Sequence, residues 1–145
     1  MRKAVLATDA SEASLRAARV LGNMARLDPD LDVVVLHVVP LPERLTPAGV
    51  AAPLTIGLQL EDYEGQQLQE VLGRTVQSLR LSEERVTTCH QIGLLAETIL
   101  EVAEEHGVDM IVMGRRGHSP LREILMGSVS QGVLHQAKVP VLIVP

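Results

Sequence analysis

The chain has 145 residues, 46% of them hydrophobic, and this length fits one domain spanning residues 1–145 with a sizeable core. Its net charge is −5 and its 13 Lys and Arg residues are scattered, so no basic surface for nucleic acid is expected. Tyr63 is the only aromatic residue and Cys89 the only cysteine, which excludes aromatic stacking platforms, intrachain disulfides and metal sites of clustered cysteines. We also expect a cytoplasmic protein without a membrane anchor, because neither a long apolar run nor an export signal is present.

Short apolar, β-branched segments alternate with segments of helical period. Strands are predicted at residues 3–8, 32–39, 85–90, 110–113 and 141–144. Helices are predicted from the apolar positions Ala13, Ala17, Val20, Leu21 and Met24, and then around residues 68–79 and 95–103, with a last helix beginning near Gly127. This alternation predicts a doubly wound, mostly parallel sheet covered by helices on both faces.

Residues 40–60 interrupt this pattern. The segment contains four prolines and two glycines, and its only charged residues are Glu43 and Arg44. It exceeds the usual length of a loop, and two interpretations stay open: a mobile insertion, or a lid or partner-binding flap.

Glycines and small polar residues follow the fourth predicted strand. Glycine lets an anion approach the main chain closely, and a helix N-terminus offers unpaired N–H groups with partial positive charge. The segment therefore predicts a phosphate site formed by the main chain from Gly127 to Val129, by the hydroxyls of Ser128 and Ser130, and by candidate side chains at Arg115, Arg116 and His118.

Two common nucleotide-binding motifs are missing. The first predicted strand ends in Ala7-Thr8-Asp9-Ala10-Ser11 without the glycines of a dinucleotide fingerprint. A Walker A loop is excluded because the only lysines, Lys3 and Lys138, lie outside any glycine loop.

The spacing G-x2-G-x9-G-S at Gly114, Gly117, Gly127 and Ser128 resembles the ATP-binding motif of the universal stress protein family. The likeness extends in order through Val5-Leu6-Ala7-Thr8-Asp9, Leu36-His37-Val38-Val39, Asp109-Met110-Ile111-Val112-Met113-Gly114 and Val139-Pro140-Val141-Leu142-Ile143-Val144. It covers nearly the whole chain.

The resemblance implies a five-stranded, Rossmann-like sheet in the order 3-2-1-4-5, whose switch point lies between the first and fourth strands. Ligands bind beyond the carboxyl ends of the strands at such a point, here Thr8-Asp9 and Met113-Gly114. It further implies that Asp9 serves the ribose or adenine, that the Val38 main chain binds adenine, and that Met113 lines the base pocket. The phosphates, bridged by Mg2+, are then expected to contact Gly114, Gly117, Gly127, Ser128, Val129 and Ser130.

Plainer interpretations remain for some of these residues. Asp9 or Ser11 is also a candidate N-cap of the first helix, Ser128 is a candidate N-cap of the last, and Gly114 is a candidate strand end. Arg115 and Arg116 are most simply interpreted as solvated surface charges. Ala7 and Ala10 stand where the family commonly has glycine, so a positive φ at either would strain the loop.

The last strand, Val141–Val144, is very apolar and is expected at the edge of the sheet, where the resemblance implies a two-fold homodimer. The resulting hypothesis is an ATP-binding regulatory protein that binds rather than turns over its ligand, with at most slow hydrolysis. The alternatives are an interaction module that binds no nucleotide and, more distantly, an adenylate-forming or ATP-pyrophosphatase-like enzyme.

Overall fold

The computed structural model describes residues 2–40, 53–117 and 126–145, and in its second helix the side chains from residue 65 onward. The five strands are β1 (Arg2–Ala7), β2 (Leu31–Pro40), β3 (Val86–Gly93), β4 (Met110–Gly114) and β5 (Val141–Val144). The helices are α1 (Glu12–Leu27), α2 (Pro53–Leu79), the short 3-10 helix η2 (Glu83–Arg85), α3 (Leu95–Glu105) and α4 (Ser128–Gln136).

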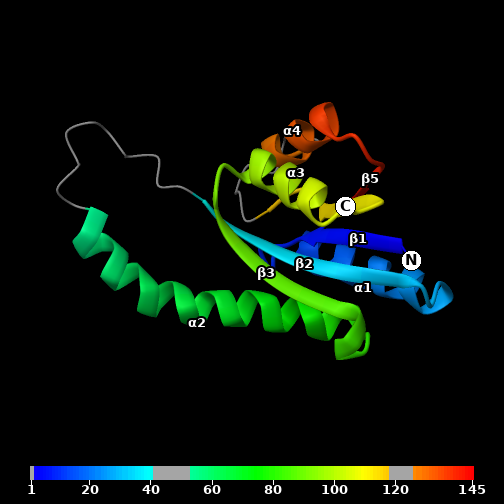
Figure 1. The fold of residues 1–145 in the computed structure, drawn as a ribbon, viewed down its shortest axis with the longest axis horizontal. Helices are drawn as coiled ribbons and strands as arrows, with labels where there is room; N and C mark the ends of the chain where they lie inside the picture. The colour runs from blue at the N-terminus through cyan, green and yellow to red at the C-terminus, as the bar shows by residue number, and fades with distance from the viewer. Residues whose placement is uncertain (1, 41–52, 118–125) are drawn as a thin grey trace.

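All strand pairs are parallel and the sheet order is β3-β2-β1-β4-β5, which confirms the predicted fold (Figure 1). The order reverses between β1 and β4, so their carboxyl ends, Ala7 and Gly114, flank the crevice expected at the switch point. β5 lies at one edge, as predicted, and β3 at the other.

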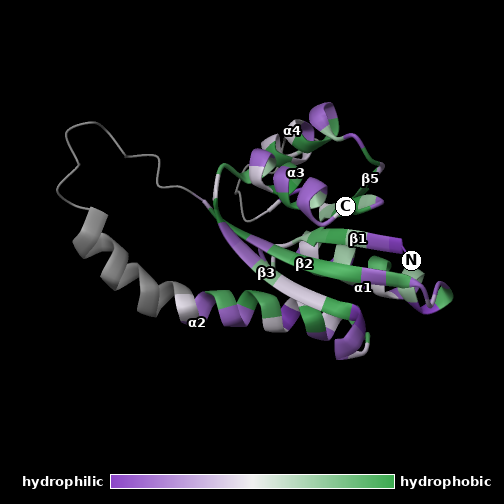
Figure 2. Ribbon diagram, in the orientation of Figure 1, coloured by the Kyte–Doolittle hydropathy of each residue, from purple (hydrophilic) through white to green (hydrophobic). Residues whose placement is uncertain are grey.

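The sheet separates two apolar layers. Helices α1 and α2 cover one face, where Leu21 and Leu79 are fully buried. Helices α3 and α4 cover the other face through residues such as Val102 and Val133. Figure 2 shows the contrast between the largely apolar β2, which is covered on both faces, and the more polar edge strand β3.

Helix α1 begins at a side-chain cap. The Ser11 hydroxyl accepts a hydrogen bond from the Ser14 N–H at 3.3 Å, so Ser11, rather than Asp9, is the N-cap. The buried face of the helix consists of small residues and Leu21: Ser14, Ala17, Ala18, Leu21, Gly22 and Ala25. Val20 and Met24 were predicted on that face but lie at its rim, 36% and 37% exposed. The reason is that small side chains let α1 approach the sheet closely, leaving the larger ones to the side.

The prediction for residues 40–60 was partly wrong. Residues 53–60 form the first turns of α2, and Pro53 is its first residue, where proline suits a helix because no N–H is needed there. Positions 41–52 of this segment, for which a mobile insertion and a lid or partner-binding flap were both open, lie outside the described residues.

Candidate functional site

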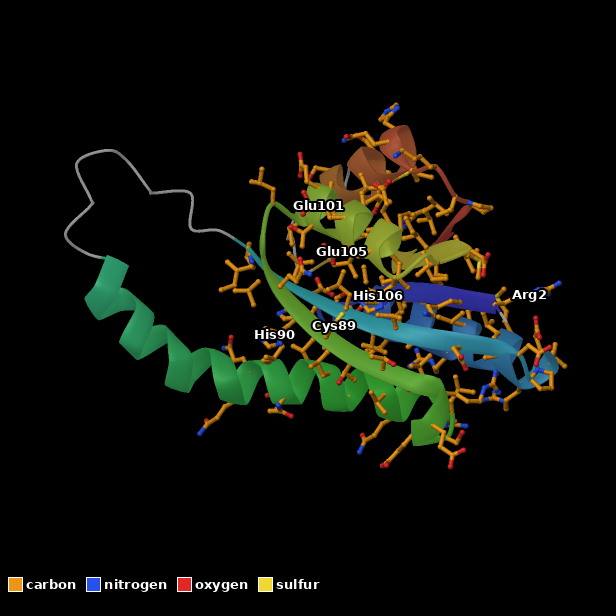
Figure 3. All side chains as sticks on the ribbon, viewed as in Figure 1. Arg2, Cys89, His90, Glu101, Glu105 and His106 are labelled. Carbon is orange, nitrogen blue, oxygen red and sulfur yellow. The ribbon has the colours of Figure 1, made fainter. Side chains whose placement is uncertain are left out.

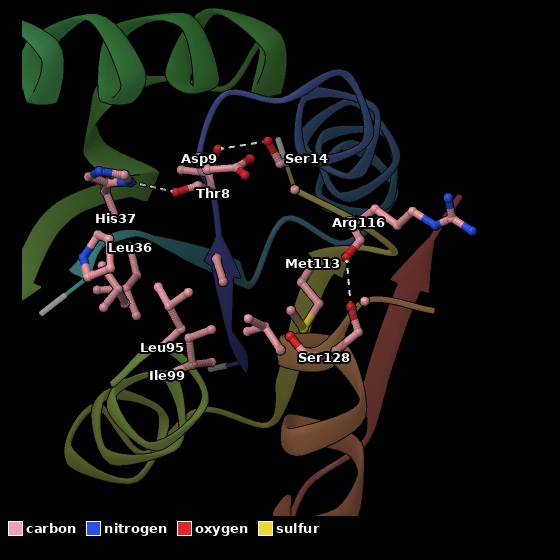
Figure 4. A pocket seen from close by; sticks show the side chains of 18 of the residues that line it. Thr8, Asp9, Ser14, Leu36, His37, Leu95, Ile99, Met113, Arg116 and Ser128 are labelled. Atoms are coloured by element: carbon pink, nitrogen blue, oxygen red, sulfur yellow. Dashed lines mark hydrogen bonds between the residues drawn. The ribbon is translucent and has the colours of Figure 1, made fainter. Parts of the chain in front are cut away.

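A cavity of about 630 Å³ lies at the carboxyl ends of β1, β2 and β4, beside the first turn of α4 (Figure 4). This is the size of a typical small-molecule pocket. It is lined by apolar residues of the sheet and α3 and by polar residues of the two loops: Ala7, Thr8, Asp9, Ser14, Leu36, His37, Val38, Pro40, Leu95, Ile99, Met113, Gly114, Arg116, Gly117, Met126, Gly127, Ser128, Val129, Ser130 and Gln131.

All the predicted site residues except Arg115 line this cavity: Thr8, Asp9, Val38, Met113, Gly114, Gly117, Gly127, Ser128, Val129 and Ser130. The neighbouring Arg116 lines it in place of Arg115. Both arginines follow a strand end, so the sequence alone had no means of telling which one lines the cavity; the guanidinium of Arg116 is directed away from it (Figure 4). His118 lies outside the described residues.

The turn after β1 is held by local hydrogen bonds. The Asp9 carboxylate accepts from the Ser11 N–H at 2.9 Å, which closes an Asx turn. Thr8 is 6% exposed, and its hydroxyl lies 2.9 Å from the hydroxyl of Thr75 on α2 and accepts from the Ala10 N–H at 3.1 Å. Thr8 therefore ties the turn to α2, while the Asp9 side chain faces the cavity (Figure 4).

Ala10 in this turn adopts φ 57°, so the strain predicted for a non-glycine residue at this position is present. We expect Ala10→Gly to raise the free energy of unfolding by about 0.5–1 kcal/mol. Relief of a left-handed alanine gains about 1–2 kcal/mol, and the greater freedom of glycine in the unfolded chain offsets part of that gain. Urea denaturation of the two proteins measures the difference, and a destabilised variant would contradict the assignment of strain to Ala10.

The apolar side of the cavity combines the end of β2 with α3 and β4. Leu36, Val38, Ile99 and Met113 are all buried residues of one core layer. The Thr8 N–H donates to the Leu36 carbonyl at 2.9 Å, so the main-chain polar groups of Leu36 face β1. Peptide groups alternate in direction along a strand, so those of Val38 face the same side, into the space beyond the end of β1.

Sequence reasoning missed several lining residues of the cavity, among them His37, Leu95 and Ile99. His37 lies in a predicted strand and is not among the predicted site residues. Its Nδ1 lies 2.8 Å from the Thr8 carbonyl, and the half-buried ring also lines the cavity. Leu95 and Ile99 were assigned to a helix face of the core, because periodicity does not distinguish a core position from one at the end of a cavity.

The motif glycines of the second loop adjoin protein atoms. A Cβ at Gly114 would lie 2.8 Å from main-chain atoms of Ala13 and Ser14 in α1, and one at Gly117 would lie 2.4 Å from the Asp9 carboxylate. Neither glycine has a positive φ. Glycine is thus needed at these positions because the end of β4 and the loop that follows it lie very close to α1 and to Asp9. This reason adds to the one inferred from the sequence, namely that glycine lets an anion approach the main chain.

The first turn of α4 is open toward the cavity. Gly127 is its N-cap and has no side chain to accept from the N–H groups of Ser128 and Val129. The Gly127 N–H itself donates to the Arg115 carbonyl at 3.0 Å and so closes the loop. Ser128 is exposed, whereas Ser130 is 2% exposed, with its hydroxyl 2.8 Å from that same carbonyl.

The remaining chemistry-bearing side chains form no second site in the part of the chain that the structure describes. No three His, Cys, Asp or Glu residues there are placed to hold a metal ion. None of the described helices is long and apolar enough to cross a membrane. Cys89 is half-buried on β3 and faces α3, which carries Glu101 and Glu105 (Figure 3).

Burial, and to a lesser degree the Glu105 carboxylate, raise the pKa of the Cys89 thiol. We therefore expect iodoacetamide to alkylate Cys89 more slowly than a small free thiol at neutral pH. The pH at which the alkylation rate of Cys89 rises should also be higher than for that free thiol. Glu105→Gln removes the negative charge and should shift the rate profile to lower pH. An unshifted profile would show that the carboxylate has no influence on this thiol.

A model of the universal stress protein family matches residues 1–145. Universal stress protein MJ0531 of Methanocaldococcus jannaschii is 34% identical to this chain over 144 residues, covering 99% of the chain and 81% of that protein. The solved structure of MJ0577 is 27% identical with a TM-score of 0.77, covering 99% of this chain and 94% of that one. The crystal structure of a universal stress protein in complex with cAMP is 24% identical with a TM-score of 0.66, covering 99% and 96%. The chain belongs to the universal stress protein family.

Proposed function

We propose that the cavity binds an adenine nucleotide, with ATP as the expected ligand, and that the protein acts through occupancy of this site rather than through turnover. The observation that supports the proposal best is the pairing of two unlike surfaces in one cavity. An apolar slot at Leu36, Val38 and Ile99 lies on one side, and the open first turn of α4 lies on the other.

Each part of the ligand matches one part of this cavity. The chain has no Trp or Phe, so aliphatic side chains must enclose the base, and the Val38 main chain is directed to hydrogen-bond its edge. The phosphates fit the N–H groups of Ser128 and Val129, where the helix dipole favours an anion. Arg116 lines the cavity, although its guanidinium is directed away from the cavity in Figure 4, so the N–H groups of α4 are the main attraction for the anion.

Asp9 is the only acidic side chain among the described lining residues. A Mg2+ ion would therefore be held mainly by phosphate oxygens and water, which is the usual arrangement for this ion. Its chemistry at this site would be charge neutralisation of the triphosphate. The Asp9 carboxylate already accepts the Ser11 N–H and suits ribose or an ordered water better than direct coordination.

A relative with this fold was crystallised in complex with cAMP, which supports a nucleotide as the class of ligand. Calorimetric titration of nucleotide-stripped protein with Mg-ATP, ADP, AMP, cAMP and adenosine tests the proposal. Calorimetry is the suitable method because the chain has no tryptophan and only one tyrosine as intrinsic fluorophores. Saturable binding of ATP with weaker binding of adenosine is expected. Absence of binding by every nucleotide would favour the interaction module instead.

We further propose that β5 mediates a two-fold homodimer. Val141, Leu142 and Ile143 on this edge strand are only half-buried, and its outer edge offers main-chain hydrogen-bonding groups to a second copy. Pro140 and Pro145 bracket the strand and limit the possible register. Light scattering after gel filtration should give twice the chain mass, and a monomer at micromolar concentration would exclude this assembly.

A further inference from the structure

The hydroxyl of Ser130 is occupied inside the protein. It lies 2.8 Å from the Arg115 carbonyl and 3.3 Å from the Gly114 carbonyl, and Ser130 as a whole is 2% exposed. A serine hydroxyl has one proton to donate, and the shorter contact, to Arg115, is the better bond. The sequence pattern had assigned this hydroxyl to the phosphates.

Two donors from the start of α4 converge on the Arg115 carbonyl. The Gly127 N–H donates to it at 3.0 Å and the Ser130 hydroxyl at 2.8 Å. The N–H of Arg115 in turn donates to the Val144 carbonyl of β5 at 2.7 Å. The loop that follows β4 is thus attached to α4 by one carbonyl and to the sheet by the adjacent amide.

The direction of one carbonyl determines the direction of the next amide. In a planar trans peptide the C=O of Arg115 and the N–H of Arg116 point in opposite directions. Holding the carbonyl against α4 therefore turns the Arg116 N–H away from α4. The next carbonyl, of Arg116, lies 3.5 Å from the Ser11 hydroxyl on the far side of the crevice, which similarly directs the Gly117 N–H.

Released from Ser130, the Arg115 carbonyl would be freer to turn toward the cavity, which Arg116 and Gly117 line. A carbonyl oxygen there would repel a phosphate, whereas N–H groups attract it. The buried hydroxyl thus determines which polar groups of the loop an anion meets.

We propose that Ser130 is a positioning residue for the phosphates: it orients the loop at Arg115 and Arg116 without touching the ligand, while the exposed Ser128 is the hydroxyl that contacts it. This inference rests on the proposed nucleotide site and specifies how that site is built. It separates two serines that the G-S-x-S pattern presents as equivalent.

A series of substitutions at position 130 shows whether ATP binding depends on the hydrogen-bond donor or on the volume of the side chain. Ser130→Thr keeps a hydroxyl, Ser130→Cys keeps the size but is a weak donor, and Ser130→Ala has no donor. We expect ATP affinity to fall about tenfold in the alanine and cysteine variants and less than threefold in the threonine variant. Adenosine affinity should stay within twofold in all three, because the base side does not depend on this bond.

The amide chemical shifts of the nucleotide-free protein distinguish a positioning role from direct contact with the phosphates. Substituting a serine that only contacts phosphate would leave these shifts unchanged. Ser130→Ala should shift the amide resonances of Arg116 and Gly117 before any ligand is added. The matched control, Ser128→Ala, should weaken ATP binding and leave those two resonances in place. Both variants are compared by thermal melting, and Ser130→Cys serves for the measurement if the alanine variant does not fold.

The outcomes separate this inference from the proposed function. Wild-type protein that binds neither ATP nor tripolyphosphate would overturn both. Wild-type protein that binds ATP, with a Ser130→Ala variant that binds it equally well, would overturn the role of Ser130 alone. Equal losses of ATP and adenosine affinity would also overturn it, since they indicate general damage to the cavity.

Discussion

Gly117→Val should lower the affinity for ATP by about a hundredfold, equivalent to about 2.7 kcal/mol of binding free energy. A Cβ at Gly117 would lie 2.4 Å from Oδ2 of Asp9, and the two further methyl groups of valine would narrow the cavity between the loops. Gly117 is exposed and the atom it meets is the end of a side chain, so the free energy of unfolding should change by less than about 1 kcal/mol. Calorimetric titration together with urea denaturation measures both quantities.

A double-mutant cycle shows whether this effect passes through Asp9. Gly117→Ala introduces only the Cβ that meets the carboxylate, and Asp9→Ala removes the carboxylate. If the glycine is needed to accommodate Asp9, then Gly117→Ala should weaken binding in the wild-type background and have little effect in the Asp9→Ala background. Additive losses would instead indicate that position 117 approaches the phosphates directly.

Gly114→Ala should lower the free energy of unfolding by about 2–3 kcal/mol. The added Cβ would lie 2.8 Å from the carbonyl carbon of Ala13 and from the Ser14 nitrogen, and 2.9 Å from the Ala13 side chain. These main-chain atoms belong to the first turns of α1, so the helix must move away from β4 to make room. Urea denaturation monitored by circular dichroism at the helical band measures the loss.

Gly73→Ala is the matched control for that experiment. Gly73 is exposed in the middle of α2, and a Cβ there would meet nothing within 4 Å. Alanine is favoured over glycine in a helix by about 0.8–1 kcal/mol, so this variant should be stabilised. Opposite signs for the same chemical change at positions 73 and 114 would separate crowding from helix propensity. Stability unchanged by Gly114→Ala would show that α1 adjusts to the methyl group at no cost.

The arrangement of elements was predictable because it depends on patterns local in sequence. Continuous apolar strands alternating with amphipathic segments indicate a parallel sheet, and the family resemblance implied its order, both of which the structure confirms. The start of α2 was missed because residues 53–60 have the composition of a loop. Proline at a first helical position is compatible with both interpretations.

The residues that line the cavity were predictable where they adjoin a strand end. Thr8, Asp9 and Gly114 follow from the rule that ligands bind at the switch point of an open sheet. His37 and Ile99 were not, since their place beside the cavity depends on how far β2 extends past β1 and where α3 crosses it. Which of Arg115 and Arg116 lines the cavity likewise depends on how the chain turns after β4.

By itself the sequence determined the class of fold, the family and the two loops that line the candidate site, because these depend on periodicity, glycine spacing and the order of motifs along the chain. Only the tertiary structure decided what individual groups in those loops do: that Ser11 caps α1, that Thr8 and Ser130 are occupied inside the protein, and that Gly117 faces Asp9. The physical reason is that a hydroxyl or an amide can bond to the protein or to a ligand. Which of the two it does depends on distances of a few ångströms between segments far apart in the chain.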